Sequence, residues 1–291
     1  MTLTNLDKVL WPKDKFTKAA AIDYYARIAD TILPHLRDRP LTRVRFPDGV
    51  DGQRFFEKRA PNHTPDWVRT APIEMGSVGT LDFIVCDERA TLIWLAQLAA
   101  LELHPSLAAA RRPNRPTALA FDLDPGEPAT AVECAVIALR LRDLFADLGL
   151  ECFPKHSGSK GIQVYVPLNV PRVTFEQTKT YARAIAQAME RSDPDLVVSK
   201  QKKELRKGKV LVDWSQNDYS KTTVAVYSLR CREEPWASAP LLWEEVEALA
   251  ESDDPTSVRF LASEVLDRVE EHGDLFAPVL ELEQKLPKSR G

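Results

Sequence analysis

The stretch TALAFDLD at residues 117–124, closed by Pro125-Gly126, decides the fold and points to the chemistry. Its run of small and apolar residues before a turn signal predicts a buried strand. Asp122 and Asp124 are two residues apart, so on a strand both side chains point to the same face. Neighbouring carboxylates repel each other unless cations lie between them, and paired divalent metals commonly serve phosphoryl transfer. The same residues also suit a structural turn, because Asp-Pro-Gly is a turn signal.

Three further strand-like runs follow this stretch. They are IQVYVPL at 162–168, KVLVDW at 209–214 and TTVAVYSL at 222–229. Each run is rich in β-branched residues and is bounded by Gly, Pro, Asn or Lys. The second run brings in Asp213, so a third strand-end aspartate joins the first two. Three such carboxylates fit a two-metal site. The alternative is that these aspartates only mark the points where strands end and loops begin.

Helical patterns with recognisable starts lie before and between these strands. Thr17 precedes KAAAIDYYARIADTIL, and Thr91 precedes LIWLAQLAALEL, which is apolar almost all round and is expected to be a buried helix. Two capping boxes begin at Thr130 and Thr174 and predict long helices. From residue 117 the order is strand, helix, strands, helix, strands. This order predicts a sheet with helices on one face, which is an α+β arrangement.

The loop SGSKG at residues 157–161 lies between two of the predicted strands. Its glycines let the backbone approach a ligand closely, its N–H groups can cradle an anion, and Lys160 adds a positive charge. A strand rather than a helix follows, so the loop is not a Walker A motif. It suits a grip for a triphosphate or, alternatively, a tight hairpin.

Other candidate residues are less specific. FFEKR at residues 55–59 places aromatic side chains for stacking beside cations for phosphates, although adjacent Phe residues are common in cores. His104 closes the predicted buried helix, where a structural histidine is the alternative. Lys221 and Arg230 flank the run at 222–229 and equally suit ordinary surface charges.

Length and composition are those of a globular protein. The 291 residues, 44% of them hydrophobic, allow one elaborate domain or two packed modules. The first fifteen residues lack the apolar stretch of a signal peptide, and no segment is long and apolar enough to span a membrane. We therefore expect a cytoplasmic protein with no membrane partner. The four cysteines are far apart and are expected to be reduced thiols in the core.

Charge is distributed unevenly along the chain. The net charge is −4, but residues 1–60 carry twelve Lys or Arg and eight Asp or Glu, whereas residues 233–291 carry five and fifteen. Screening confines the effect of a charge to about 10 Å, so an acidic protein can still offer phosphates a basic face. The segment KQKKELRKGK at 200–209 has six cations around one Glu. A solvated loop is the alternative to a phosphate contact there.

Several of these motifs match a known family as a set. FDLDPG, SGSKGIQVYVPL and VDWSQN followed by KTTVAVYSLR resemble the three signature motifs of the polymerase domain of bacterial ligase D, in the archaeal/eukaryotic-type primase–polymerase superfamily. The likeness extends to about residue 235 and includes NLDKVLWP, RPLTRVRFPDGV, FFEKRAPNH and TLIWLAQLAALELHP. It implies a primase–polymerase fold, with a central, largely antiparallel catalytic sheet, flanking helices and a packed N-terminal α/β module. We expect that DNA-contacting module at 1–110, the catalytic sheet at 111–235 and an acidic helical segment at 236–291, packed as one globular unit.

The resemblance also implies a function. It predicts a template-dependent nucleotidyltransferase that adds rNTPs or dNTPs to DNA 3′ ends in gap filling or double-strand-break end joining. The cofactors would be two divalent metal ions, Mn²⁺ or Mg²⁺, and the DNA would be gapped or broken, with a 5′-phosphate. A separate DNA ligase and a DNA-end-binding protein would be partners. No K-x-D-G adenylation motif of a ligase is present, so a free-standing polymerase module is expected.

The resemblance, together with the charge pattern, assigns three groups of residues. The catalytic residues and metal ligands would be Asp122, Asp124 and Asp213. The nucleotide contacts would be His104, Ser157, Lys160, Gln163, Gln216 and Arg230. The DNA contacts would be Lys8 and Lys18 on the 5′-phosphate, Phe55 and Phe56 on the template, and Arg43, Arg45, Lys58 and Lys221.

Two positions depart from the family pattern, and other functions stay open. Gln163 replaces the usual final His of S-G-x-K-G-x-H, and Val44 stands where a Lys is common. One alternative is a primase that starts chains de novo. Another is a two-metal nuclease, which would need no triphosphate grip. The third is a catalytically silent DNA-end-binding protein of the same fold, against which the three intact aspartates argue.

Overall fold

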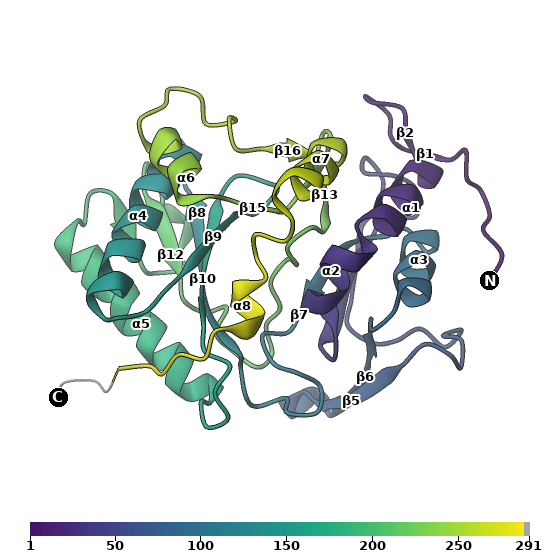
Figure 1. Cartoon of the computed structure of the whole chain (residues 1–291), viewed down its shortest axis with the longest axis horizontal. Coiled ribbons are helices and arrows are strands. Elements are labelled where there is room, and N and C mark those ends of the chain that lie inside the picture. The colour runs from purple at the N-terminus through teal and green to yellow at the C-terminus, as the bar shows by residue number, and fades with distance from the viewer. Residues whose placement is uncertain (288–291) are drawn as a thin grey trace. The chain divides into compact units, whose positions relative to one another are not determined.

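The computed structural model describes residues 1–287, and Figure 1 shows the course of the chain. The chain forms two compact units, each built from segments that are far apart in sequence. Unit 1 comprises Met1–Pro113, Thr222–Ser238 and Phe260–Asp274. Unit 2 comprises Asn114–Lys221, Ala239–Arg259 and Leu275–Gly291. The segments 111–235 and 236–291, which the sequence suggests as separate modules, are each divided between these two units.

Unit 2 is organised around a six-stranded sheet. The strand order is β11 (Val197–Val198), β12 (Val210–Asp213), β8 (Ala118–Pro125), β10 (Ile162–Pro167), β9 (Phe153–His156) and β15 (Ala239–Pro240). All neighbours are antiparallel except β11 and β12. The predicted largely antiparallel sheet is confirmed.

Helices pack on and around this sheet. Helix α4 (Ala131–Asp147) contacts β8 and β10, α5 (Phe175–Ser192) contacts β8 and β11, α6 (Trp243–Ala250) packs against α4, and the short α8 (Pro278–Glu281) contacts β10. The 3-10 turn η2 is Lys203–Leu205. Both predicted capping boxes are present, at Thr130 and Thr174. The ring of Phe121 on β8 packs against Phe145 of α4, with centroids 5.7 Å apart. Because alternate residues of a strand point to opposite faces, burying Phe121 under α4 leaves Asp122 on the other face.

Unit 1 contains an antiparallel sheet and two small ones. The larger sheet has the order β4 (Phe55–Glu57), β3 (Pro40–Arg45), β6 (Thr80–Val85) and β5 (Thr70–Glu74), and β7 (Ala100–Pro105) pairs with β3. The 3-10 turn η1 is Gly76–Val78. The small sheets are β1 (Val9–Trp11) with β2 (Phe16–Thr17), and β13 (Leu229–Cys231) with β14 (Pro235–Ala237) and β16 (Phe260–Leu261).

Four helices complete unit 1. They are α1 (Lys18–Arg27), α2 (Ala29–Leu36), α3 (Arg89–Gln97) and α7 (Ala262–His272). Thr17 caps α1 as predicted, since its side chain accepts from the backbone N–H of Ala20 at 3.2 Å. The pattern after Thr17 forms two helices, because the chain breaks at Ile28. No helix within residues 1–287 is long and apolar enough to cross a membrane.

The prediction of one buried helix after Thr91 is wrong in its extent. Helix α3 starts before Thr91, and the chain leaves it through Ala99, which has a left-handed φ of +54°. Residues 100–105 then form strand β7, so His104 lies on a strand. A run that is apolar all round has no periodicity to separate a buried helix from a buried strand, which is why the sequence did not reveal the break.

The prediction of a strand at 222–229 is also wrong. This segment is buried but mostly irregular, and only its last residue joins β13. The N–H of Ala225 donates to the carbonyl of Leu103 at 2.8 Å, so part of it runs along β7 without forming a ladder. Tyr227 has a φ of +66°, which turns the chain before Leu229. Burial favoured β-branched residues here without regular pairing.

Candidate active site

Four polar residues from four strands occupy one row across the unit 2 sheet. The strand register pairs Asp213 with Asp122, Asp122 with Gln163, and Gln163 with Lys155. Residues directly opposite each other on antiparallel strands point to the same face. We call these four residues the polar row. Asp124 lies two residues after Asp122 on the same strand face, so the three aspartates of the sequence motifs lie at one place on the sheet.

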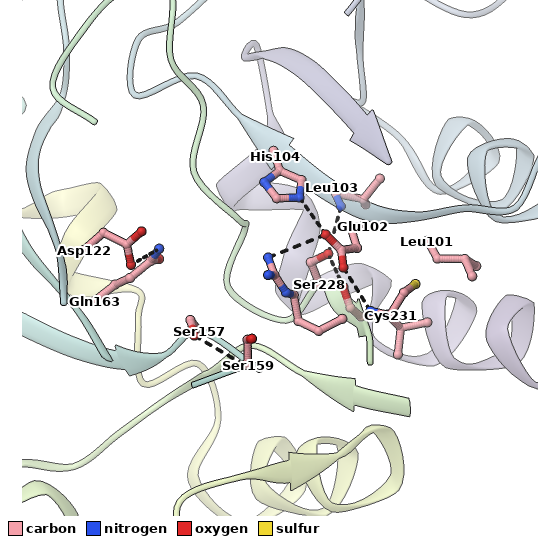
Figure 2. A network of polar contacts seen from close by, with 12 residues as sticks. Leu101, Glu102, Leu103, His104, Asp122, Ser157, Ser159, Gln163, Ser228 and Cys231 are labelled. Atoms are coloured by element: carbon pink, nitrogen blue, oxygen red, sulfur yellow. Dashed lines mark hydrogen bonds and ion pairs between the residues drawn. The ribbon is translucent and has the colours of Figure 1, made fainter. Parts of the chain in front are cut away.

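Asp122 and Asp124 are each held by a side chain from another part of unit 2. Nε2 of Gln163 donates to Oδ1 of Asp122 at 3.1 Å (Figure 2). NH1 of Arg206 donates to Oδ2 of Asp124 at 3.1 Å, and this carboxylate is half exposed. Both carboxylates therefore have a neutral or cationic donor in place.

Asp213 accepts hydrogen bonds from three donors. Oδ1 accepts from Nε2 of Gln201 and from the backbone N–H of Ser215, both at 2.8 Å. Oδ2 accepts from Nε2 of Gln216 at 2.9 Å. Gln216, expected at the nucleotide, thus contacts a candidate metal ligand in this structure.

The electrostatics of the row are those of crowded acids. The pKa of Asp122 is raised to about 6, first by burial and then by the negative charges of Asp213 and Asp124, while Gln163 and Lys155 act in the opposite direction. A carboxyl group with a strongly perturbed pKa beside other acids is a mark of functional sites. Lys155 is a fully buried lysine whose ammonium lies 5.8 Å from the centre of the Tyr165 ring.

The donor chemistry of the row suits a divalent cation. Carboxylate oxygens are the ligands that Mg²⁺ and Mn²⁺ prefer. As the side chains stand, no three His, Cys, Asp or Glu residues within residues 1–287 are grouped to hold one ion. The aspartates are instead turned toward amide and guanidinium groups. Oε1 of Gln163 is buried without a hydrogen-bond partner, and an ion or its bound water beside Asp122 would satisfy it.

The SGSKG loop forms the tight hairpin between β9 and β10. Oγ of Ser157 accepts from the backbone N–H groups of Ser159 and Gly161, both at 3.3 Å (Figure 2). The N–H of Gly158 donates to Nδ1 of His156 at 3.1 Å. Lys160 extends from the loop and pairs with Glu127 at 2.9 Å, with both side chains mostly exposed. The backbone donors are therefore engaged within the hairpin, while the ammonium lies in a weak, solvated ion pair.

The basic segment at 200–209 packs onto the end of β8. A Cβ atom on Gly126 would lie 2.0 Å from the backbone carbonyl oxygen of Arg206, so only glycine fits there. The N–H of Gly208 also donates to the carbonyl of Gly126 at 2.9 Å. This close approach places the guanidinium of Arg206 on Asp124. Arg206 is thus a cation already held at a candidate metal ligand.

A second polar cluster lies in unit 1, around Glu102 (Figure 2). Oε2 of Glu102 lies 3.1 Å from Nε2 of His104 and 3.6 Å from NH1 of Arg230. Oε1 accepts from the backbone N–H of Cys231 at 3.0 Å. Burial raises the pKa of Glu102, but His104, Arg230 and the Cys231 N–H outweigh it and lower this pKa to about 2. Two expected nucleotide contacts, His104 and Arg230, therefore share one buried carboxylate.

The expected template residues lie on β4, which pairs with β3. Phe55 and Phe56 are 38% and 62% exposed, so both can stack on a base. Behind them, Glu57 binds NH2 of Arg43 at 2.8 Å and NH1 of Arg45 at 3.1 Å. Arg43 is fully buried and also donates to the carbonyl of Arg59 at 2.9 Å. Arg43 therefore supports the strand that carries the phenylalanines, and its own side chain is not exposed to solvent.

The two lysines expected at a 5′-phosphate lie near each other. Burial lowers the pKa of Lys18, and the charge of Lys8 lowers it further. Nζ of Lys18 donates to the carbonyl of Thr4, and Nζ of Lys8 to Asp48, both at 2.9 Å. Two crowded ammonium groups suit an anion. Lys58 is half-buried and Lys221 is exposed.

A model of the LigD primase-polymerase domain matches residues 17–276 of this chain. The chain belongs to the LigD primase-polymerase domain family. This family consists of nucleotidyltransferases, and its fold is the one described above.

Comparison with individual proteins agrees with this family. The chain is 43% identical over 279 residues to the multifunctional non-homologous end joining protein LigD of Mycolicibacterium smegmatis, covering 95% of this chain and 36% of that protein. It is 32% identical to the bifunctional LigD of Bacillus subtilis, covering 94% and 43%. The chain thus spans less than half the length of these relatives. The solved polymerase domain of Mycobacterium tuberculosis ligase D, in complex with DNA, matches with a TM-score of 0.89 and 41% identity, over 98% of this chain and 99% of that one.

Several residues at the site of this LigD primase-polymerase domain were not predicted from the sequence. They are Glu102, Lys155, Gln201 and Arg206. Glu102 and Lys155 are single charged residues beside apolar neighbours, which is a signal because burying a charge requires a partner. Arg206 lies in a cation-rich segment where no single cation stands out. Gln201 has no signal in the sequence.

Proposed function

We propose that this chain is a template-dependent polymerase that adds nucleotides to DNA 3′ ends during gap filling and double-strand-break end joining. The observation that carries the proposal is the polar row with Asp124, which gathers three aspartates from two strands on one face of the sheet. The solved relative was captured in complex with DNA, and the LigD relatives are named as end-joining proteins. These relatives support the choice of DNA ends as substrate. The protein would then act on chromosomal DNA in the cytoplasm, as a nucleoid-associated protein.

The residues that would hold two divalent metal ions are Asp122, Asp124 and Asp213. When bound, such ions would stabilise the charge that develops on the attacking and departing oxygens. Gln163 orients Asp122 by donating to one oxygen, which leaves the other oxygen for the ion. Gln201 and Gln216 hold Asp213 differently, because they donate to both of its oxygens. Arg206 donates to one oxygen of Asp124, and its positive charge there opposes a cation at the same carboxylate until the guanidinium moves away.

The remaining residues would bind substrates. Ser157, Lys160, His104 and Arg230 are proposed contacts of the incoming triphosphate, with Lys160 free to exchange its exposed partner for a phosphate. Phe55 and Phe56 are proposed to stack on the template. Lys8 and Lys18 are proposed to capture the 5′-phosphate of a gap, and Lys58, Lys221 and Arg45 are proposed to line the DNA. A separate DNA ligase and an end-binding protein are the proposed partners.

Extension assays test this function. Primer extension on gapped, overhanging and unprimed templates, with rNTPs or dNTPs and with Mn²⁺ or Mg²⁺, should give template-directed addition to gapped and overhanging ends. Product on unprimed template would favour a primase. DNA-end binding without any addition would favour a silent end-binding protein, and shortening of the primer without nucleotides would favour a nuclease.

A further inference from the structure

Glu102 stands out among the buried acids of unit 1 because it joins two residues of the proposed nucleotide site. It lies on β7, where its side chain is 9% exposed, and it reaches His104 on the same strand and Arg230 on β13. The same carboxylate accepts from the N–H of Cys231. Two strands that are distant in sequence are therefore joined through one side chain.

The carboxylate dictates which nitrogen of His104 carries a proton. Glu102 is ionised at neutral pH, so it can only accept hydrogen bonds. Nε2 of His104, 3.1 Å away, must therefore be the donor. This fixes the Nε2–H form of the ring and its orientation, whereas an unconstrained imidazole exchanges between two tautomers.

The surroundings of this carboxylate carry an excess of positive charge. Burial lowers the pKa of Arg232, and the nearby charges of Arg230 and Arg54 lower it further, while Glu102 raises it. The ring of Phe56 lies 6.5 Å from that of His104 in an edge-on arrangement, so one side of the imidazole is apolar. Arg230 and Arg232 together outnumber the one acid, which leaves a site that favours a multivalent anion.

We propose that Glu102 is a positioning residue of the nucleotide site, which fixes the ring of His104 and holds Arg230 beside it so that both are presented to the triphosphate. This inference rests on the proposed function, because that function makes His104 and Arg230 nucleotide contacts. Glu102 itself carries the same sign of charge as the ligand, so it acts through its two partners. Replacing it should therefore weaken binding even though one negative charge is removed.

Glu102→Gln is the decisive variant. The carboxylate accepts on two sides, from His104 and from the Cys231 N–H, whereas an amide has one accepting oxygen and one donating nitrogen. The amide can keep both contacts only if His104 changes to the other tautomer, and in either case Arg230 loses its counter-charge. We expect the Kd for ATP with Mn²⁺, measured by calorimetry, to rise about 10- to 100-fold, as for the loss of charge-assisted hydrogen bonds. In primer extension KM should rise more than kcat falls, and the loss should be larger for ATP than for AMP.

A spectroscopic readout separates positioning from general damage. In protein labelled with ¹⁵N-histidine, long-range proton–nitrogen correlation should show His104 of the wild type protonated at Nε2, with the signal identified by its absence in His104→Ala. Glu102→Gln should shift this signature, and Glu102→Asp, which keeps two acceptors, should restore it at least in part along with ATP affinity. Glu102→Asp also provides the test if Glu102→Gln fails to fold.

Asp274→Asn is the matched control. Asp274, which is half-buried, forms another histidine–carboxylate pair of unit 1, with Oδ2 2.8 Å from Nε2 of His35, and it accepts from the Tyr227 hydroxyl at 2.7 Å. The Asp274→Asn substitution should leave the Kd for ATP within about twofold of the wild-type value. A folded Glu102→Gln protein that keeps the His104 signature and wild-type ATP affinity overturns the inference. Wild-type protein that neither binds ATP nor extends primers overturns the proposed function instead, while the tautomer signature still tests the geometry.

Discussion

Neutralising Asp122 should make the metal-free protein more stable at neutral pH. Folding raises the pKa of Asp122 from 3.8 to about 6, first through burial and then through Asp213 and Asp124. An acid whose pKa is raised by folding ionises first in the unfolded chain. It therefore costs no stability below about pH 4, where both states are protonated, and its full penalty applies above about pH 6. Asp122→Asn removes this penalty and keeps an oxygen that can accept from Gln163.

The magnitude follows from the size of the shift. Two pKa units correspond to about 3 kcal/mol, and screening reduces this because Asp122 keeps some contact with solvent, so we expect about 1–3 kcal/mol at pH 7.5. The assay is urea unfolding, followed by circular dichroism in EDTA, from pH 4.5 to 8. The difference in free energy of unfolding between Asp122→Asn and the wild type should shrink steadily toward pH 4.5. Asp147→Asn, at the exposed end of α4, is the matched control variant.

Divalent metal reverses the order of the two proteins if the aspartates bind it. Mn²⁺ should stabilise the wild type, because a ligand that binds only the folded state adds stability by mass action. It should stabilise Asp122→Asn much less. A variant that is less stable than wild type in EDTA at pH 7.5, or a gain that is equal at all pH values, would refute the electrostatic reasoning.

Three further outcomes are expected. Asp213→Ala should abolish nucleotide addition and keep the far-ultraviolet spectrum of the fold. Full-rate primer extension by this variant would remove the two-metal proposal. Gapped DNA with a 5′-phosphate should bind more tightly than the same gap with a 5′-hydroxyl, and this preference should weaken as salt rises. The preference should disappear in a Lys8→Ala, Lys18→Ala double variant. Equal binding of both gaps by the wild type at low salt would count against end joining. Gln163→Ala should raise the activation free energy for kcat/KM by about 1–3 kcal/mol, because Asp122 loses its buried donor. Gln163→His should change kcat/KM only modestly between pH 5.5 and 8. A gain of well over tenfold in the His variant, largest below pH 6.5, would show that charge at residue 163 matters more than positioning.

The catalytic sheet is predictable from the sequence because its strands are regular. The strands β8, β10 and β12 were expected at 117–124, 162–168 and 209–214, and the structure places them within one or two residues of those limits. Their short apolar runs end at turn residues, which is the strongest local signal for a strand. The capping boxes of α4 and α5 were equally direct, since the motif is itself the hydrogen-bonded structure.

The errors arise where local sequence is not decisive. The helix α3 and strand β7 form one continuous apolar run, and the break at Ala99 depends on a left-handed residue that composition does not reveal. The partners of the aspartates were also hidden. Arg206 reaches Asp124 because the chain approaches Gly126 closely, and such a contact between distant segments leaves no local pattern.

The polar clusters of the two units carry surplus charge of opposite sign. Among the described residues of unit 2, the cations at the three aspartates are Arg206 and Lys155, so that cluster has surplus negative charge and attracts divalent ions. In unit 1 the single carboxylate of Glu102 lies with Arg230 and Arg232, so that cluster attracts a multivalent anion. A divalent ion would supply the charge that the three aspartates lack, whereas DNA alone would not. A protein that merely binds DNA ends has no physical reason to keep three crowded acids, because each adds repulsion that a neutral residue would remove. The crowding of Asp122 is therefore better explained by catalysis than by end binding.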